Sequence, residues 1–281
     1  MSHRSDQLTA SKLPNRMWVR STAYVRTELI RTTPSARAAG LPTVNESYST
    51  ALTADPDDEY WKRGPNYQGI DGSVGALAVY NDCLIAAGTF SIACDTLVCN
   101  IAAWNGSFWA PLGSGIVGTI VGTRVSALAV YDSKLIAAGF FVTAGGVAAS
   151  NIAAWDGFSW SPLGSGTSGE IFALAVYAGT LIASGQFSAA GGVAASMVAS
   201  WDGAAWAPLG AGLSGGWVST LTEYNGLLVA GGSFTTAGGL PANRIASWNG
   251  AAWAPLGTGM NDEVLALASF DGKLVAGGVF T

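Results

Sequence analysis

Charged residues are scarce in this sequence of 281 residues. Asp, Glu, Lys and Arg together make up 11% of it, against about 25% in ordinary soluble domains, while hydrophobic residues make up 49%. This balance excludes a chain that is disordered because of its charge. No apolar stretch is long enough, and free enough of glycine and polar residues, to predict a membrane-spanning helix.

Histidine and cysteine are also nearly missing. His3 is the only histidine, which excludes Ser-His-Asp hydrolysis, a histidine general base and ordinary zinc sites. Three cysteines exclude a disulfide-framework scaffold. Cys94 and Cys99, five positions apart in one expected loop, either form a local bridge or stay free. Free thiols are favoured because no secretory signal is visible, and the sequence assigns no compartment.

The few charges are divided unevenly along the chain. Residues 1–45 carry seven Lys and Arg against two Asp and Glu, a net charge of +5, and residues 46–281 carry six against sixteen, a net charge of −10. A body this acidic repels nucleic-acid phosphates. Residues 1–46 are expected to form a basic arm, either a docking arm or a flexible tail in preference to a targeting segment.

A unit of about 46 residues recurs through the rest of the chain. It opens on an apolar run, and the leucines of successive openings are 51, 46, 47 and 46 residues apart: Leu77, Leu128, Leu174, Leu221 and Leu267. A second apolar run, a loop of ten residues, a third run ending in Trp-Asn-Gly or Trp-Asp-Gly, and a Trp-led fourth run follow. Asn-Gly and Asp-Gly accept the positive φ angles of tight hairpin turns. Each unit therefore predicts a four-stranded antiparallel blade of an all-β fold.

The first and second runs are rich in Ala and Gly, as expected for strands crowded near a propeller axis. The tryptophans of the outer strands are expected to fill the wedge between neighbouring blades, each burying about 150–250 Å². Together these features predict a β-propeller built by repetition.

The fifth unit contains only its first two runs, which would leave an open sheet edge. The missing half is predicted upstream, because Trp61 precedes Leu77 much as Trp160 precedes Leu174. Strands over about residues 47–53 and 60–63 would complete the blade begun by residues 264–281. We therefore expect a five-bladed β-propeller over residues 47–281, with its last blade shared between the two ends and an irregular arm before it.

The segment LIAAGFFVTAGGVAASNIAAWDGFSWSPLG combines a glycine-ended second strand, an aromatic third strand, a turn and a Trp-led fourth strand. This pattern resembles Kelch repeats and the related propeller of galactose oxidase over roughly residues 47–281, although Trp replaces the usual Tyr of the third strand. Copper-radical oxidases of that architecture need histidine ligands, and His3 lies in the arm. The resemblance thus implies the fold without the oxidase activity, and no cofactor is expected.

Candidate binding residues are departures from the repeat. In a propeller the loops from the second to the third strand and from the fourth to the next first strand share one face, and here these loops are the longer ones. The departures on that longer-loop face, with Arg124 placed in a five-residue insertion, are Asp95, Arg124, Glu170, Trp217, Arg244, Asp262 and Glu263.

Trp217 is the only propeller tryptophan outside the repeat positions. An exposed loop aromatic suits stacking on a sugar or on a partner's side chain, or it plugs the central channel or packs on the adjacent loop. Asp262, Glu263 and Glu170 would form an acidic cluster for carboxylate chemistry. Solvated loop charge is favoured, because adjacent residues on an extended segment point to opposite sides.

Three functions remain open. The first is a non-catalytic binding or assembly module that engages a protein or a glycan through the longer-loop face. The second is a structural subunit that self-associates when the basic arm of one copy docks on the acidic propeller of another. The third, a carboxylate-based hydrolase, ranks last because the convergent polar groups it needs are not evident. No catalytic, metal-binding or cofactor-binding residue is predicted.

Overall fold

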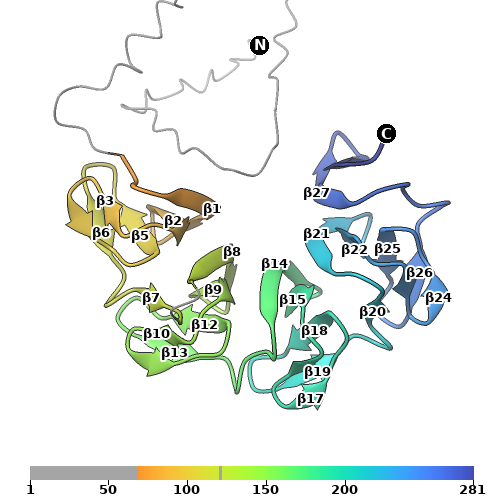
Figure 1. The fold of residues 1–281 in the computed structure, drawn as a ribbon, viewed down its shortest axis with the longest axis horizontal. Coiled ribbons are helices and arrows are strands. Elements are labelled where there is room, and N and C mark those ends of the chain that lie inside the picture. Colours follow the sequence, from red (N-terminus) through yellow and green to blue (C-terminus); the bar gives the residue numbers. More distant parts are fainter. Residues whose placement is uncertain (1–68, 120–121) are drawn as a thin grey trace, which may run out of the picture.

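The computed structural model describes residues 69–119 and 122–281, and all regular elements within them are β-strands. Four antiparallel four-stranded sheets follow one another along the chain. They stand around a common axis like the blades of a propeller (Figure 1). The prediction of an all-β propeller with four-stranded blades is confirmed at this level. The arm and the strands expected over residues 47–53 and 60–63 lie outside the described residues.

Each blade keeps its long strands in sequence order from the axis outward. The complete blades are blade 1 with β1 (Ser73–Tyr80), β2 (Cys83–Thr89), β5 (Ile101–Trp104) and β6 (Trp109–Pro111); blade 2 with β8 (Arg124–Tyr131), β9 (Lys134–Phe140), β12 (Ile152–Trp155) and β13 (Trp160–Pro162); blade 3 with β14 (Glu170–Tyr177), β15 (Thr180–Gln186), β18 (Val198–Trp201) and β19 (Trp206–Pro208); and blade 4 with β21 (Val218–Tyr224), β22 (Leu227–Gly232), β25 (Ile245–Trp248) and β26 (Trp253–Pro255). A fifth unit contains the two-stranded sheet of β27 (Val264–Phe270) and β28 (Lys273–Gly278).

The segment expected as a plain loop between the second and third strands contains a small hairpin in every complete blade. The hairpins are β3 (Ile92–Ala93) with β4 (Thr96–Leu97), β10 (Thr143–Ala144) with β11 (Val147–Ala148), β16 (Ala189–Ala190) with β17 (Val193–Ala194), and β23 (Thr236–Ala237) with β24 (Leu240–Pro241). In two of them the preceding connector adds a third strand, β7 (Ile116–Val117) or β20 (Leu213–Ser214).

The turn of each small hairpin depends on residues that adopt positive φ. Gly145 and Gly146 have φ of +60° and +79°, a region that favours glycine. A Cβ on Gly145 would also lie 2.9 Å from the Trp160 ring. The hairpin therefore folds down onto the blade's outer tryptophan, a contact that the spacing of apolar residues does not show.

The first strands β1, β8, β14, β21 and β27 form the inner edge of the arrangement (Figure 1). Each carries a β-bulge at the same point, as between Val125 and Ala127 in β8. The second-strand glycine lies opposite this bulge. A Cβ on Gly139 would come within 2.0 Å of the Arg124 carbonyl oxygen, and the glycines of the other units face the same obstacle. The recurring glycine is thus required by the close approach of the bulged strand.

Neighbouring blades are joined by a repeated hydrogen bond from the fourth-strand tryptophan. The Trp160 indole donates from Nε1 to the carbonyl oxygen of Leu112 in the preceding blade, at 2.9 Å. The same bond joins Trp206 to Leu163 and Trp253 to Leu209, at 2.8 and 3.0 Å. The donating rings are 3–5% exposed. The expectation that these tryptophans fill the wedge between blades is confirmed, and the Leu side chain of the Trp-x-Pro-Leu-Gly run is buried in the same cluster as the donating ring.

A second hydrogen bond between neighbouring blades is made by the tyrosine at the end of the first strand. The Tyr80 hydroxyl donates to the Ser133 carbonyl oxygen, which belongs to the tight turn of the next blade. Tyr177 and Tyr224 make the same bond to Gly226 and Gly272. The interfaces between blades 1 and 2 and between blades 3 and 4 therefore carry a bond at both the inner and the outer edge.

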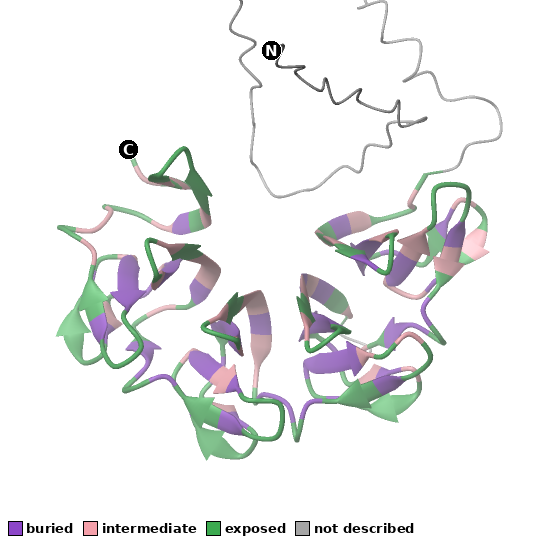
Figure 2. Ribbon diagram, turned by 180° about the vertical axis from the view of Figure 1, so that it is seen from behind, coloured by how far each residue is buried: buried purple, intermediate pink, exposed green. Residues whose placement is uncertain are grey.

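The core is divided among the interfaces between blades. Figure 2 shows buried residues concentrated inside the four-stranded blades and where they meet, while the β27–β28 hairpin is mostly exposed. One cluster combines Ile85 and Ile101 of blade 1 with Leu135, Phe141 and Trp160 of blade 2. The following interfaces repeat this mixture. Burial thus depends on stacking of neighbouring units, as in other repeat architectures.

The two ends of the described arc expose repeat positions that are less exposed in the other units. Phe270 at the end of β27 is 73% exposed, whereas Tyr80 at the same position of β1 is 7% exposed. Val275 in β28 is 48% exposed, against 0–2% for its equivalents Ile85, Ile136, Ile182 and Val229. At the opposite end, Leu77 of β1 is also exposed. Two uncovered apolar faces thus bound the described arc.

We expect Trp160→Phe to lower the free energy of unfolding by about 2 kcal/mol, because it removes the bond to Leu112 and part of a buried ring. Trp217→Phe, at a half-exposed ring, serves as the control and should cost less than about 1 kcal/mol. Urea unfolding followed by circular dichroism measures both. Equal losses in the two variants would contradict the structural importance of the bond.

Candidate functional site

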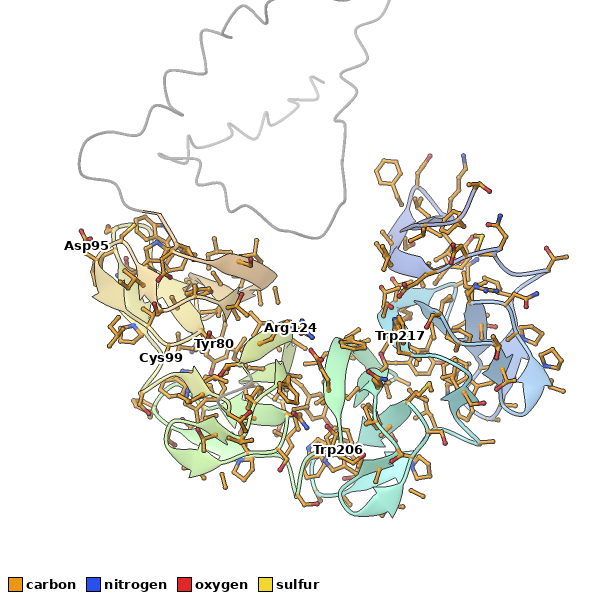
Figure 3. The ribbon with its side chains drawn as sticks, in the orientation of Figure 1. Tyr80, Asp95, Cys99, Arg124, Trp206 and Trp217 are labelled. Atoms are coloured by element: carbon orange, nitrogen blue, oxygen red, sulfur yellow. The ribbon has the colours of Figure 1, made fainter. Side chains whose placement is uncertain are left out.

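Four of the seven candidate residues occupy one position of the repeat. Each first strand has a buried Val or Ile as its first or second residue, and we call the residue just before this Val or Ile the axial position. The five axial residues are Ser73, Arg124, Glu170, Trp217 and Glu263, and the buried residues that follow are Val74, Val125, Ile171, Val218 and Val264. Arg124 and Trp217 lie on the axis side of the arc (Figure 3). A single structural position therefore carries a different chemistry in nearly every blade.

Arg124 and Glu170 form an ion pair between blades 2 and 3. The Arg124 guanidinium lies 2.7 Å from Glu170 Oε1 through Nε and 2.5 Å from it through its terminal nitrogen. The Ser126 hydroxyl donates to the same oxygen at 3.4 Å. The Arg124 side chain is 55% exposed and that of Glu170 is 15% exposed. This carboxylate is thus already compensated within the chain.

Trp217 and Glu263 form the matching pair between blades 4 and 5. The Trp217 indole donates from Nε1 to Glu263 Oε1 at 2.6 Å. The Ser219 hydroxyl donates to the same oxygen at 2.9 Å. The donors occupy the positions that Arg124 and Ser126 occupy two blades earlier. Here a neutral indole replaces the guanidinium.

The β-bulge explains why a serine joins each pair. Ser126 lies between Val125 and Ala127, where the register shifts, and Ser219 lies at the equivalent shift between Val218 and Thr220. A bulge leaves its extra residue outside the regular pairing and re-aims its side chain. The axial residue and the serine two positions later thereby reach the same carboxylate. The sequence analysis does not identify these serines, although an alignment of the units on their first buried Val or Ile places both of them two residues after the axial position.

Trp217 is held firmly in spite of its exposure. Its backbone N–H donates to the Ser233 hydroxyl, and its carbonyl oxygen accepts from the Ser233 backbone N–H, both at 3.0 Å. The ring is 38% exposed, while the other eight described tryptophans form four tilted pairs with centroids 5.4–5.6 Å apart. Trp217 is thus the described tryptophan whose ring faces solvent from a fixed backbone.

The remaining candidates lie elsewhere, and one placement was wrong. Arg124 was expected inside an insertion, but it is the first residue of β8, because the extra residues are accommodated before the strand. Asp95 is in the outer β3–β4 turn (Figure 3). Arg244 precedes β25 with φ of +65°. Asp262 caps the backbone N–H of Glu263. The longer-loop face therefore has an axial group and separate outer residues.

Two other groups on this face have shifted pKa values. Hydrogen bonds from the Ser91 hydroxyl and the Ile92 backbone N–H lower the pKa of Asp71. Burial raises the pKa of the Cys94 thiol, Asp95 adds to the rise, and the Trp109 side chain acts in the opposite direction. Cys94 and Cys99 are free, and the raised pKa of Cys94 disfavours its thiolate, the nucleophilic form.

The described residues hold no group of three or more His, Cys, Asp or Glu side chains suited to a metal ion. They also contain no helix with the length and apolar character needed to cross a membrane.

Comparisons with known proteins add little beyond this geometry. No protein-family model matches the chain, and no curated protein sequence matches it. Among solved structures, the chain is similar to the WD40 β-propeller domain of Doa1 at 14% identity and a TM-score of 0.45, covering 75% of this chain and 63% of that one. It is also similar to the computationally designed Ika8 protein at 17% identity and a TM-score of 0.41, covering 74% and 69%. The blade architecture therefore rests on the strand pairing of this chain itself.

We expect a double-mutant cycle of Arg124→Met and Glu170→Gln to give a coupling free energy of about 0.2–1 kcal/mol, because the pair is partly exposed. Raising sodium chloride to about 0.5 M should reduce it by screening. Thermal unfolding of the four chains measures the coupling. A cycle of Lys134→Met with Glu170→Gln is the control, and coupling of equal size there would contradict a specific pair.

Proposed function

We propose that this chain is a non-catalytic binding platform that engages a protein or a glycan through the longer-loop face of a Kelch-like β-propeller. The observation that carries the proposal is the axial position. The repeat keeps its glycines, tryptophans and turns nearly constant, while this one position takes Ser, Arg, Glu, Trp and Glu. A rigid scaffold that presents varied polar and aromatic side chains at one face is suited to recognition.

The contacts of the axial carboxylates support a binding role over catalysis. Glu170 accepts from Arg124 and Ser126, and Glu263 accepts from Trp217 and Ser219. Proton transfer needs a carboxyl oxygen that is free to reach the reacting group, and Oε1 of each glutamate already accepts from two side chains of this chain. The carboxylates are therefore better suited to hold ligand groups than to transfer protons.

Glycan and peptide arrays probed with the full chain test this platform. If Trp217 contributes to the contact, Trp217→Ala should weaken the strongest signal by about thirtyfold, which corresponds to a central interface aromatic. Phe158→Ala is the matched control, because Phe158 is 92% exposed but lies in a tight turn on the opposite face. A signal lost with Phe158→Ala and kept with Trp217→Ala would assign binding to the wrong face and overturn the proposal.

We further propose that residues 47–53 and 60–63 complete the unit of β27 and β28 as a shared fifth blade. The uncovered faces at Phe270 and Val275 and at Leu77 support this closure, since their equivalents are more buried where blades meet. The Trp109 indole is the first in the series, and no leucine carbonyl from an earlier blade accepts from it among the described residues. A preceding blade would provide such a carbonyl.

Trp61 and Trp18 provide a matched pair for testing closure. If Trp61 opens the fourth strand of the shared blade, Trp61→Ala should lower the free energy of unfolding by about 3 kcal/mol, as expected for a buried large ring. Trp18→Ala, in the arm, should change it by less than about 0.5 kcal/mol. Chemical unfolding measures both, and amide hydrogen exchange should show protection of residues 274–278. Rapid exchange there, with no effect of Trp61→Ala, would refute the shared blade.

A further inference from the structure

The two axial pairs share one geometry and differ in charge. In each, an axial donor and a serine of one blade converge on Oε1 of the glutamate in the next blade. At Glu170 the axial donor is a guanidinium, so the pair is neutral. At Glu263 the donor is a neutral indole, and no basic side chain among the described residues forms an ion pair with this carboxylate.

The surroundings of Glu263 add negative charge and an aromatic surface. Asp262 is exposed beside it, and its carboxylate interacts with the Glu263 backbone N–H. The Trp217 ring is 38% exposed and held by two backbone bonds to Ser233. A cation gains both from a carboxylate and from the face of an indole ring, and Arg makes such contacts more often than Lys. The site therefore matches the chemistry of an arginine side chain.

We propose that Trp217 and Glu263 bind an arginine side chain supplied by the basic segment 1–45 of this chain. The inference rests on the proposed binding platform and names the partner of its axial site. The incoming guanidinium compensates the charge of Glu263 as Arg124 compensates that of Glu170. Segment 1–45 carries seven Lys and Arg and a net charge of +5, opposite to the net −10 of residues 46–281. Charge complementarity thus favours this segment as the occupant.

A labelled peptide of residues 12–31, which contains Lys12 and four arginines, is the probe. Its binding is followed by fluorescence anisotropy at low salt. The host is the full chain in which Arg16, Arg20, Arg26 and Arg31 are changed to Gln, so that the tethered segment does not compete. We expect this host to bind the peptide at least about fivefold more tightly than the unchanged chain, because a tethered ligand has a high effective concentration.

Two substitutions in that host address the site itself. Glu263→Gln keeps an acceptor oxygen but removes the charge, and should weaken binding about fivefold. Trp217→Arg reproduces the Arg–Glu pair found between blades 2 and 3. The new arginine should pair with Glu263, and peptide binding should weaken at least as much as with Glu263→Gln. Glu223→Gln is the control for net charge, because Glu223 is exposed near the opposite end of β21, and it should leave the affinity unchanged.

Each contrary result has a distinct meaning. If Glu263→Gln and Glu223→Gln weaken peptide binding equally, the arginine site is overturned, because the binding then reflects only general attraction between opposite charges. This result does not contradict the binding platform. Equal peptide binding by the unchanged and the arginine-substituted chains would overturn segment 1–45 as the occupant. If a neutral glycan binds the chain, and Trp217→Ala abolishes this binding while Glu263→Gln leaves it unchanged, the arginine site is overturned and the binding platform is supported. Failure of every peptide and glycan to bind would remove the platform as well.

Discussion

The bond from a tryptophan indole to a leucine carbonyl of the preceding blade is the interaction on which the remaining structure depends. Trp160, Trp206 and Trp253 each make it from a buried ring. A single blade has two apolar faces and cannot bury either alone, so the angle at which the next blade packs decides whether a core exists. The ring fills the wedge between blades, and its N–H restricts the ring to one orientation. Stability in this molecule is therefore a property of interfaces.

Inside each blade, the bulge of the first strand separates the residues that pack in the blade from the axial residue, which is available for binding. It requires glycine on the second strand, as at Gly139, because the carbonyl of the axial residue approaches too closely for any Cβ. The same bulge re-aims Ser126 and Ser219 toward the neighbouring carboxylate. The axial side chain does not pack in the core of the blade, so this position accepts Arg in one blade and Trp in another with the same backbone conformation. Variation is thus confined to a position where it does not disturb packing.

Much of the fold was predictable from sequence, because the signals are local and repeated. Turn dipeptides, apolar runs and the period of about 46 residues predict four-stranded blades, and blades of that kind are present. The small hairpins were missed because two-residue strands leave no periodic pattern, only the Gly145-Gly146 turn. For the site, sequence identified Arg124, Glu170, Trp217 and Glu263 but not their pairing. Pairing depends on the angle between blades, which no local pattern records, and Asp95 was grouped with them although it lies at the outer edge.

The axial position also raises a question of parity. Around the described arc, donors and acceptors alternate as Arg124, Glu170, Trp217 and Glu263. In a closed ring with an odd number of members, donors and acceptors cannot alternate all the way round. One position must therefore have a donor as its neighbour on one side and an acceptor on the other. In the five-bladed ring proposed above, that member is Ser73, between Glu263 and Arg124. A hydroxyl both donates and accepts, so this serine is able to donate to a carboxylate on one side and accept from a guanidinium on the other.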